Sequence, residues 1–366
     1  MHTDTTLDRD DATRALVAAT EVAGRAPSIH NTQPWRWRIH DSVADLYADE
    51  RRHLAVADPQ RRLLVLSCGL ALHHACVALA ATGYAARVDR MPYGADPEHL
   101  GRLASVAVDG RVPVTAEVMR HMQTIRVRHT DRRPLTVAPV PAEAIAAVRA
   151  AVTAHHVGFH VLDRDAVLDL AAATDNAQRD AVDDAAARAE LDAWSGSGRA
   201  PGVGVPDSVI PVRPTLTTVP SRDFGHPGAL DVTDEHDQAA VYAVLYALGD
   251  EPLDWLCGGE ALSAAWLAAT EHNIALLPMS AAVEEVAARR TLRLILRGVG
   301  YPLIAVRLGI ADQHAPAPPA TPRLAHREIV EVTENMPAAA ANRSSRPEAA
   351  TADLRPGPFG TLGPDR

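Results

Sequence analysis

Two long apolar segments lie far apart in this chain and match each other position by position. Residues 63–81 and 257–272 are both too long for buried strands, so each is expected to form a buried helix. When the first segment is displaced by 190 positions, several residues are identical. The matching residues are Gly69, Ala71, Leu72, Ala75 and Ala78 in the first segment, and Gly259, Ala261, Leu262, Ala265 and Ala268 in the second. This match favours an internal duplication, in which two related halves pack together.

Helices and strands are expected in a similar order around both segments. The expected elements are helices at 11–23, 115–129, 141–154 and 165–194, and strands at 35–39, 45–48, 84–91, 157–162 and 303–308. The acidic run 231–237 is expected to begin a further helix, because carboxylates stabilise a helix N-terminus. This order predicts the α+β class, with helices packed on mostly antiparallel or mixed sheets.

The chain is expected to divide into two halves, an insertion and a tail. The N-terminal half is expected at residues 1–120 and the C-terminal half at 121–336. Within the second half, residues 195–228 hold six glycines and six prolines, too many for a helix or an inner strand, so we expect a lid-like insertion. Residues 337–366 are rich in Ala, Pro, Ser and Arg, which predicts a disordered tail.

The composition excludes several classes of protein. A net charge of −10 argues against a nucleic-acid partner. All 36 basic residues are arginine, which excludes lysine Schiff-base chemistry and the phosphate-binding P-loop. The cysteines and histidines lack the spacing of a metal site, so no metal is expected. The N-terminus is polar, unlike a secretory signal, and no segment is expected to span a membrane, which predicts a cytoplasmic location.

A proline-bounded loop precedes the first expected strand. Residues 26–35 read Ala-Pro-Ser-Ile-His-Asn-Thr-Gln-Pro-Trp, and the prolines stiffen an arc that carries Ser28, Asn31 and Gln33. Hydroxyl and amide groups along such an arc can bind the edge of a planar heterocycle. On these residues alone, a hydrogen-bonded turn that leads into a strand is the more common explanation.

An arginine-rich segment follows the helix expected at 115–129. Arginine occupies four of the eight positions from Arg126 to Arg133, and its forked donors match phosphate oxygens. The segment therefore indicates an anion site. A solvated basic turn is the alternative that charge runs more often form.

Both segments resemble motifs of the FMN-dependent nitroreductases. Residues 26–35 match the APSxxNxQPW loop of that family at seven positions. Arg128, Thr130 and Arg132 are similar to the RxSxR motif that binds the FMN phosphate, with threonine keeping the hydroxyl of serine. Pro134 stands where the family usually has an aromatic residue, so the turn that follows departs from the pattern.

The resemblance extends to the C-terminal region and covers roughly residues 11–330. A Gly-Tyr-Pro sequence at 300–302 precedes a strand and then Arg323, as in the family's closing pattern, where an arginine reaches the phosphate. Met279 and Ser280 resemble the turn whose backbone lies along the isoalloxazine ring. The resemblance thus implies FMN-binding roles for Pro27, Ser28, Asn31, Gln33, Arg128, Thr130, Arg132, Met279, Ser280 and Arg323.

The tandem arrangement is most similar to the Acg-type nitroreductase-like proteins, an internal pseudo-dimer with a lid over FMN. The resemblance implies two-electron transfer from NAD(P)H through FMN to a small acceptor such as a nitroaromatic or quinone. No catalytic side chain is implied, because the flavin carries the hydride. The alternative is an FMN-sequestering protein with little turnover, which a permanently closed lid would favour. Because one half keeps the proline-bounded loop and the other the arginines, one FMN per chain is expected.

Overall fold

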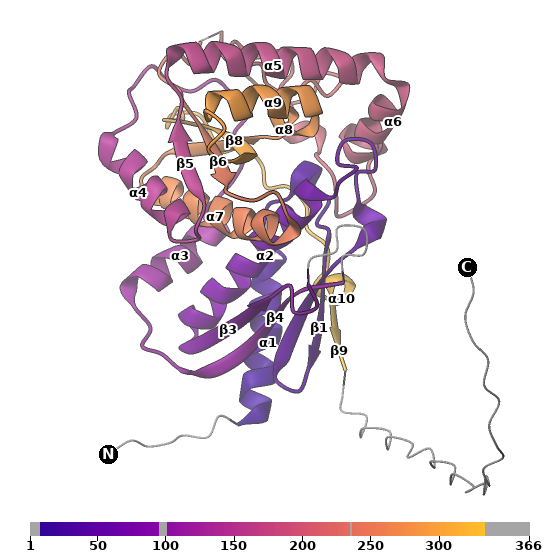
Figure 1. The fold of residues 1–366 in the computed structure, drawn as a ribbon, viewed down its shortest axis with the longest axis vertical. Helices are drawn as coiled ribbons and strands as arrows, with labels where there is room; N and C mark the ends of the chain where they lie inside the picture. Colours follow the sequence, from indigo (N-terminus) through magenta and orange to yellow (C-terminus); the bar gives the residue numbers. More distant parts are fainter. Residues whose placement is uncertain (1–7, 95–100, 235, 334–366) are drawn as a thin grey trace, which may run out of the picture. The chain divides into compact units, whose positions relative to one another are not determined.

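The computed structural model describes residues 8–94, 101–234 and 236–333, and the tail predicted at 337–366 lies outside the described residues. Figure 1 shows the ribbon. The first part of the sequence forms α1 (Arg9–Ala23), β1 (Trp35–His40), β2 (Val43–Ala48), α2 (Arg62–Ala81), β3 (Tyr84–Arg90), β4 (Arg102–Arg111) and α3 (Ala116–Val127). The second part forms α4 (Ala142–Thr153), β5 (Gly158–Val161), α5 (Arg164–Asp183), α6 (Ala185–Trp194), β6 (Val241–Ala247), α7 (Pro252–Glu271), β7 (Ala275–Met279), α8 (Ala281–Glu284), α9 (Val286–Ile295), β8 (Tyr301–Gly309), α10 (His326–Ile329) and β9 (Val330–Val332).

Two of the predicted helices differ from the structure. The helix expected at 165–194 is divided into α5 and α6 at Asp184, whose carboxylate caps α6 by accepting a hydrogen bond from the Ala186 amide at 2.8 Å. The prediction that residues 231–237 begin a helix is wrong, because the described residues of this run are not helical. Asp237 is fully buried there and pairs with Arg307, so its carboxylate serves an ion pair and not a helix terminus.

The strands form two sheets, and the four strands of the second sheet follow the same order as four of the five strands of the first. The first sheet has the order β3-β4-β2-β1-β9 and the second has the order β7-β8-β6-β5. Neighbouring strands are antiparallel, except that β9 pairs with β1 in parallel. The end of the described chain therefore completes the first sheet. The predicted α+β fold with two sheet-containing halves is confirmed.

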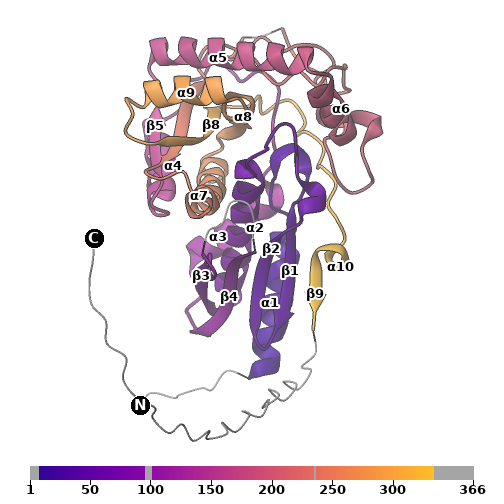
Figure 2. The ribbon, with the colours of Figure 1, turned by 45° about the vertical axis from the view of Figure 1, so that its right-hand side comes forward.

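Helices α2 and α7 pack against each other between the two sheets (Figures 1 and 2). They meet at Gly69 and Gly259, where a Cβ on either residue would collide with the backbone of the opposite helix, so only glycine permits this approach. Nearby, Nδ1 of His73 lies 2.8 Å from the hydroxyl of Ser263, and these two residues are 190 positions apart. Both pairs have the offset of the sequence match. Related helices that meet at a two-fold axis are expected to pair in this way.

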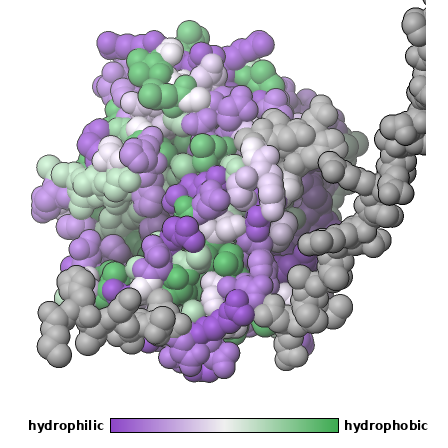
Figure 3. All heavy atoms as spheres, turned by 60° about the horizontal axis from the view of Figure 1, so that its bottom comes forward, coloured by the Kyte–Doolittle hydropathy of each residue, from purple (hydrophilic) through white to green (hydrophobic). Residues whose placement is uncertain are grey.

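Helix α2 is long and apolar enough to cross a membrane by composition alone, but most of it is buried inside the protein. Helices α1 and α7 pack against it, and its buried side chains belong to the main hydrophobic core. On the face shown in Figure 3, hydrophobic residues lie in separate patches among hydrophilic ones. The prediction of a core helix at 63–81 is therefore confirmed.

The glycine- and proline-rich insertion at 195–228 has packing of its own. Its regular structure is confined to short 3-10 turns at Gly196–Gly198 and Asp207–Val209. Four of its side chains form a separate hydrophobic cluster; they are Val205, Val209, Ile210 and Phe224. In the first half, a tight turn joins β1 to β2, whereas the matching connection from β5 to β6 contains α5, α6 and this insertion. The insertion is thus an expanded hairpin connection.

Candidate functional site

Two cavities adjoin where the proline-bounded loop, the arginine-rich segment and the insertion meet. The apolar cavity lies between α2, α7, β7 and the insertion, and its empty space, the open mouth included, is about 950 Å³. The arginine cavity, about 1010 Å³ with its open mouth included, reaches the segment before α10. The residues that line both cavities are Pro27, Ser28, His30, Thr130 and Arg132. The two cavities together therefore offer one elongated site with an apolar end and a cationic end.

The cationic end concentrates arginines that form no ion pair with the carboxylates of residues 8–94, 101–234 and 236–333. Burial, and secondarily the charge of Arg323, lowers the pKa of Arg128 to about 9. Burial likewise lowers the pKa values of Arg323 and Arg132 to about 10. In the described part of the chain, the Nε atoms of Arg128 and Arg323 have no hydrogen-bond partner. Because desolvated cations without counter-charge are costly, this cavity favours a bound anion.

Asp131, the acidic residue within the arginine-rich segment, already forms an ion pair with Arg133. The Asp131 carboxylate accepts hydrogen bonds from Nε and Nη2 of Arg133 at 2.9 and 2.7 Å. Arg128 instead stacks on the indole of Trp266, with its guanidinium carbon 4.5 Å from the ring centroid. This cation–π contact orients the guanidinium without neutralising its charge.

Asn31 holds Arg323 in the arginine cavity. Nη1 of Arg323 donates to Oδ1 of Asn31 at 2.9 Å and to the hydroxyl of Thr321 at 2.6 Å. The Asn31 amide nitrogen donates to the carbonyls of Gly204 and Pro322, each at 3.0 Å. Both ends of the Asn31 amide are therefore used within the protein, and its role is to orient the arginine and the insertion.

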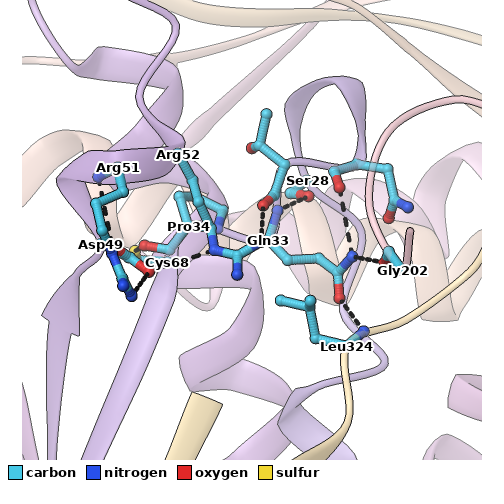
Figure 4. A network of polar contacts seen from close by, with 11 residues as sticks. Ser28, Gln33, Pro34, Asp49, Arg51, Arg52, Cys68, Gly202 and Leu324 are labelled. Atoms are coloured by element: carbon cyan, nitrogen blue, oxygen red, sulfur yellow. Dashed lines mark hydrogen bonds and ion pairs between the residues drawn. The ribbon is translucent and has the colours of Figure 1, made fainter. Parts of the chain in front are cut away.

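Gln33 lies outside both cavities, unlike the other candidate residues. Figure 4 shows its side chain among Ser28, Gly202 and Leu324. It is fully buried, and its Nε2 donates to the Gly202 carbonyl at 2.8 Å while its Oε1 accepts from the Leu324 amide at 3.0 Å. The backbone amide of Gln33 donates to the Ser28 hydroxyl at 2.9 Å. Gln33 thus joins the loop, the insertion and the C-terminal segment, and it presents no free group to a ligand.

These bonds hold a strained backbone in place. His30, Asn31 and Gln33 have φ values of 42°, 54° and 52°, a left-handed conformation that non-glycine residues rarely adopt. Such strain persists only where the surroundings determine the conformation. Burial, and secondarily Arg222, lowers the pKa of His30 to about 3, so this ring is neutral at neutral pH where it lines both cavities.

The insertion and the end of β7 both line the apolar cavity. Met279 and Ser280 line it at the end of β7, and the lining residues of the insertion are Pro220, Ser221, Arg222 and Phe224. Arg222 forms an ion pair with Glu284 and donates to the Ser280 hydroxyl at 3.2 Å. We call residues 220–224 the roof; the ion pair ties this roof to α8.

The structure brings together nine of the ten predicted residues and leaves one outside. The residues that line the two cavities are Pro27, Ser28, Asn31, Arg128, Thr130, Arg132, Met279, Ser280 and Arg323. Sequence reasoning missed His30, Arg222, Phe224 and Trp266, which also line the site. His30 stands at a variable position of the loop motif. Arg222 and Phe224 lie in an insertion without a recognisable pattern, so only the fold identifies them.

Fold and site together define an α+β protein of the nitroreductase-like class, with two sheet-containing halves and a composite site between them. Two Mycobacterium tuberculosis relatives support this class. One, named NAD(P)H nitroreductase Rv3131, is 37% identical over 86% of this chain and 90% of its own length. The other, named NAD(P)H nitroreductase Acg, is 33% identical over 87% of this chain and 96% of its own length. The chain belongs to this family of Acg-type NAD(P)H nitroreductase-like proteins.

Comparison with solved structures gives partial matches. The FMN- and NADPH-dependent nitroreductase NfnB from sphigopyxis sp. strain HMH has a TM-score of 0.36 and 18% identity, covering 59% of this chain and 99% of its own. NfnB from Mycobacterium smegmatis, in complex with NADPH, has a TM-score of 0.35 and 18% identity, covering 60% of this chain and all of its own. No protein-family model matches the chain.

Proposed function

We propose that the protein is an FMN-dependent NAD(P)H oxidoreductase that transfers two electrons to a small acceptor. The observation that carries this proposal is the cationic end of the site, where half-buried Arg128 and Arg323 form no ion pair with a carboxylate of the described residues. A flavin mononucleotide combines a planar ring with a phosphate, which matches an apolar cavity joined to an anion site. The resemblance of the motifs supports FMN as the cofactor, and the names of the relatives support NAD(P)H as the electron donor.

Particular residues would hold each part of FMN. Arg128 and Arg323 would bind the phosphate together with the Thr130 hydroxyl, because all three line the arginine cavity. Ser28 and Arg132 line both cavities, so they would contact the region between phosphate and ring. The Ser28 hydroxyl accepts from Gln33 and keeps its own proton free to donate to a ligand.

The apolar cavity would hold the ring. Met279 and Ser280 line it at the end of β7, where backbone groups of an edge strand can reach a ligand. When bound, FMN supplies the hydride chemistry. The chain's own tasks are to orient the ring, to exclude water beneath the roof and to control access. The acceptor is proposed as a nitroaromatic, a quinone or a similar small molecule.

We propose one FMN per chain, because the position related to the site by the internal two-fold is filled. Leu70 of α2 lines the apolar cavity, and its counterpart at the 190-residue offset is Glu260. Glu260 is buried and accepts two hydrogen bonds from Arg90, at 2.7 and 2.8 Å. Trp266 has Cys76 as its counterpart, and burial, followed by the Glu260 carboxylate, raises the pKa of that thiol to about 12. Paired charges thus occupy the second position.

Titration with FMN and riboflavin tests the proposal. FMN should bind tightly and riboflavin much more weakly, because only FMN carries the phosphate that the arginines bind. Flavin released from saturated protein should amount to one per chain. Equal affinity for the two flavins would show that the arginine cavity is not a phosphate site, and a ratio near two would show that both pseudo-symmetric positions are active.

One observation favours a second candidate function, the sequestration of FMN with little turnover. The insertion is tied to the rest of the protein at two places. The Arg222–Glu284 pair holds the roof, and Gln33 and Asn31 of the proline-bounded loop donate hydrogen bonds to the Gly202 and Gly204 carbonyls. A roof that stays closed would keep a nicotinamide away from the ring. Stopped-flow reduction of bound FMN by NADPH and NADH separates the candidates: rapid reduction supports the oxidoreductase. Bound FMN that dithionite reduces but neither nicotinamide does would support sequestration.

The two halves at 1–120 and 121–336 and the cytoplasmic location remain proposals. The boundary at residue 120 lies within α3, whose C-terminal end leads directly into Arg128. Assigning the whole of α3 to the second half would keep the helix and the arginine-rich segment together.

A further inference from the structure

A fully buried ion pair lies behind the arginine-rich segment and outside both cavities. Nη1 of Arg307 on β8 lies 3.0 Å from Oδ2 of Asp237, and the two side chains are 1% and 0% exposed. A buried pair of this kind adds little stability compared with apolar side chains of similar size. A positioning role explains its presence better than a contribution to stability.

Arg307 binds the backbone of the arginine-rich segment. Its Nη2 donates to the Arg133 carbonyl at 2.9 Å and to the Asp131 carbonyl at 3.3 Å. These carbonyls flank Arg132, in a stretch that forms neither helix nor strand. Because such a stretch lacks a regular hydrogen-bond ladder, the two bonds from Arg307 help to fix where Thr130 and Arg132 stand in the cavities.

Asp237 binds the backbone of the insertion just before the roof. The Thr218 amide donates to Oδ1 of Asp237 at 3.2 Å, and the Val219 amide donates to the Tyr242 hydroxyl at 3.3 Å. The roof, residues 220–224, follows directly. One buried pair therefore connects the roof to the segment that carries the candidate phosphate ligands.

We propose that Arg307 and Asp237 are positioning residues that couple closure of the roof to binding of the FMN phosphate. The coupling rests on the proposed function, because it requires the phosphate to bind at the arginine-rich segment. A phosphate that orders this segment strengthens the Arg307 bonds and so favours the closed roof. By linkage, a closed roof increases the affinity for the phosphate to the same extent.

The double variant R307M/D237N tests the positioning role. It removes both charges together, which avoids a lone buried charge, and asparagine keeps an oxygen for the Thr218 amide. FMN affinity should fall by about tenfold or more, while riboflavin affinity changes by less than about threefold. R102M/D45N is the control, since it removes another largely buried ion pair, 17% and 2% exposed, that lies outside both cavities, and it should leave both affinities unchanged. Equal losses for FMN and riboflavin in R307M/D237N would overturn the proposal.

Hydrogen exchange at the Thr218 and Val219 amides tests the coupling without reference to activity. In the wild type, saturation with FMN should slow exchange of these amides by about tenfold or more relative to saturation with riboflavin. In R307M/D237N the two flavins should protect them equally. If FMN fails to bind the wild type, the proposed function is wrong. If FMN binds through Arg128 but protects these amides no better than riboflavin, the coupling alone is refuted.

Discussion

Replacing Arg128 by methionine should change two properties in opposite directions. Methionine keeps an unbranched side chain against the Trp266 ring, which the guanidinium now faces at 4.5 Å, but it removes the charge. We expect the flavin-free protein to become more stable and FMN to bind more weakly. A residue that serves only the fold would show a loss of stability instead.

The gain in stability follows from the desolvation of the charge. Lowering the pKa of Arg128 from the ordinary arginine value to about 9 sets an upper bound of ~5 kcal/mol against the charged form. Arg128 is only half-buried, so solvent screening reduces this to ~1–2 kcal/mol. Loss of the cation–π contact subtracts ~0.5–1 kcal/mol from this gain in stability. The unfolding free energy of flavin-free Arg128→Met, measured in urea, should therefore rise by up to ~1 kcal/mol.

The loss of affinity follows from the missing hydrogen bond. A hydrogen bond to a charged group contributes ~1.5–3 kcal/mol, so FMN affinity should fall ~10- to 150-fold, measured by quenching of flavin fluorescence. Arg111→Met is the matched control, because Arg111 also stacks on an aromatic ring, that of Tyr84 at 3.8 Å, but lies outside both cavities. Lower stability of Arg128→Met together with unchanged FMN affinity would refute the reasoning.

Three further predictions concern the helix crossing, a buried histidine and the roof. A methyl group at Gly69 would enter the backbone of α7, so Gly69→Ala should lower the unfolding free energy by ~2 kcal/mol or more, whereas Gly101→Ala, which faces open space, should change it by less than ~0.5 kcal/mol. Burial holds the pKa of His74 well below 6.5, so below that pH the unfolded chain takes up a proton that the folded chain does not. The unfolding free energy should therefore fall as the pH falls, and His74→Leu should remove up to ~1.4 kcal/mol per pH unit of that slope in urea titrations. Glu284→Gln breaks the pair with Arg222, so stopped-flow reduction of bound FMN by NADPH should become faster; an unchanged rate would mean that this pair does not hold the roof.

The family motifs of two short segments indicated residues that line the cavities. The proline-bounded loop and the arginine-rich segment each carry their cavity-lining residues within a few positions, so their motifs remain visible without the fold. Helices α2 and α7 were also predictable, because long apolar runs and a constant offset survive in the sequence. Arg323 could be placed only through the resemblance, since a single arginine after a strand has no local signature.

Long-range partners could not be predicted. Gln33 was expected to face a ligand, but the insertion and the C-terminal segment, far away in sequence, take up its amide. Asp237 was expected to stabilise a helix, but Arg307 pairs with it across the second sheet. The insertion at 195–228 was expected only as a lid-like segment. Its bonds to the proline-bounded loop and its own hydrophobic cluster show that removal would also disturb the site.

The partners of Arg90 differ from those of the two arginines in the cationic cavity. The Arg90 guanidinium has a raised pKa because Glu260 pairs with it, and that pair fills the two-fold counterpart of the site. Arg128 and Arg323 have pKa values lowered by burial, and no carboxylate of the described residues forms an ion pair with them. The sequence alone does not show which of these arginines has a carboxylate partner. Since folding tolerates an uncompensated charge only where something else is gained, the two unpaired arginines locate the anion site, and the paired one explains why its counterpart is closed.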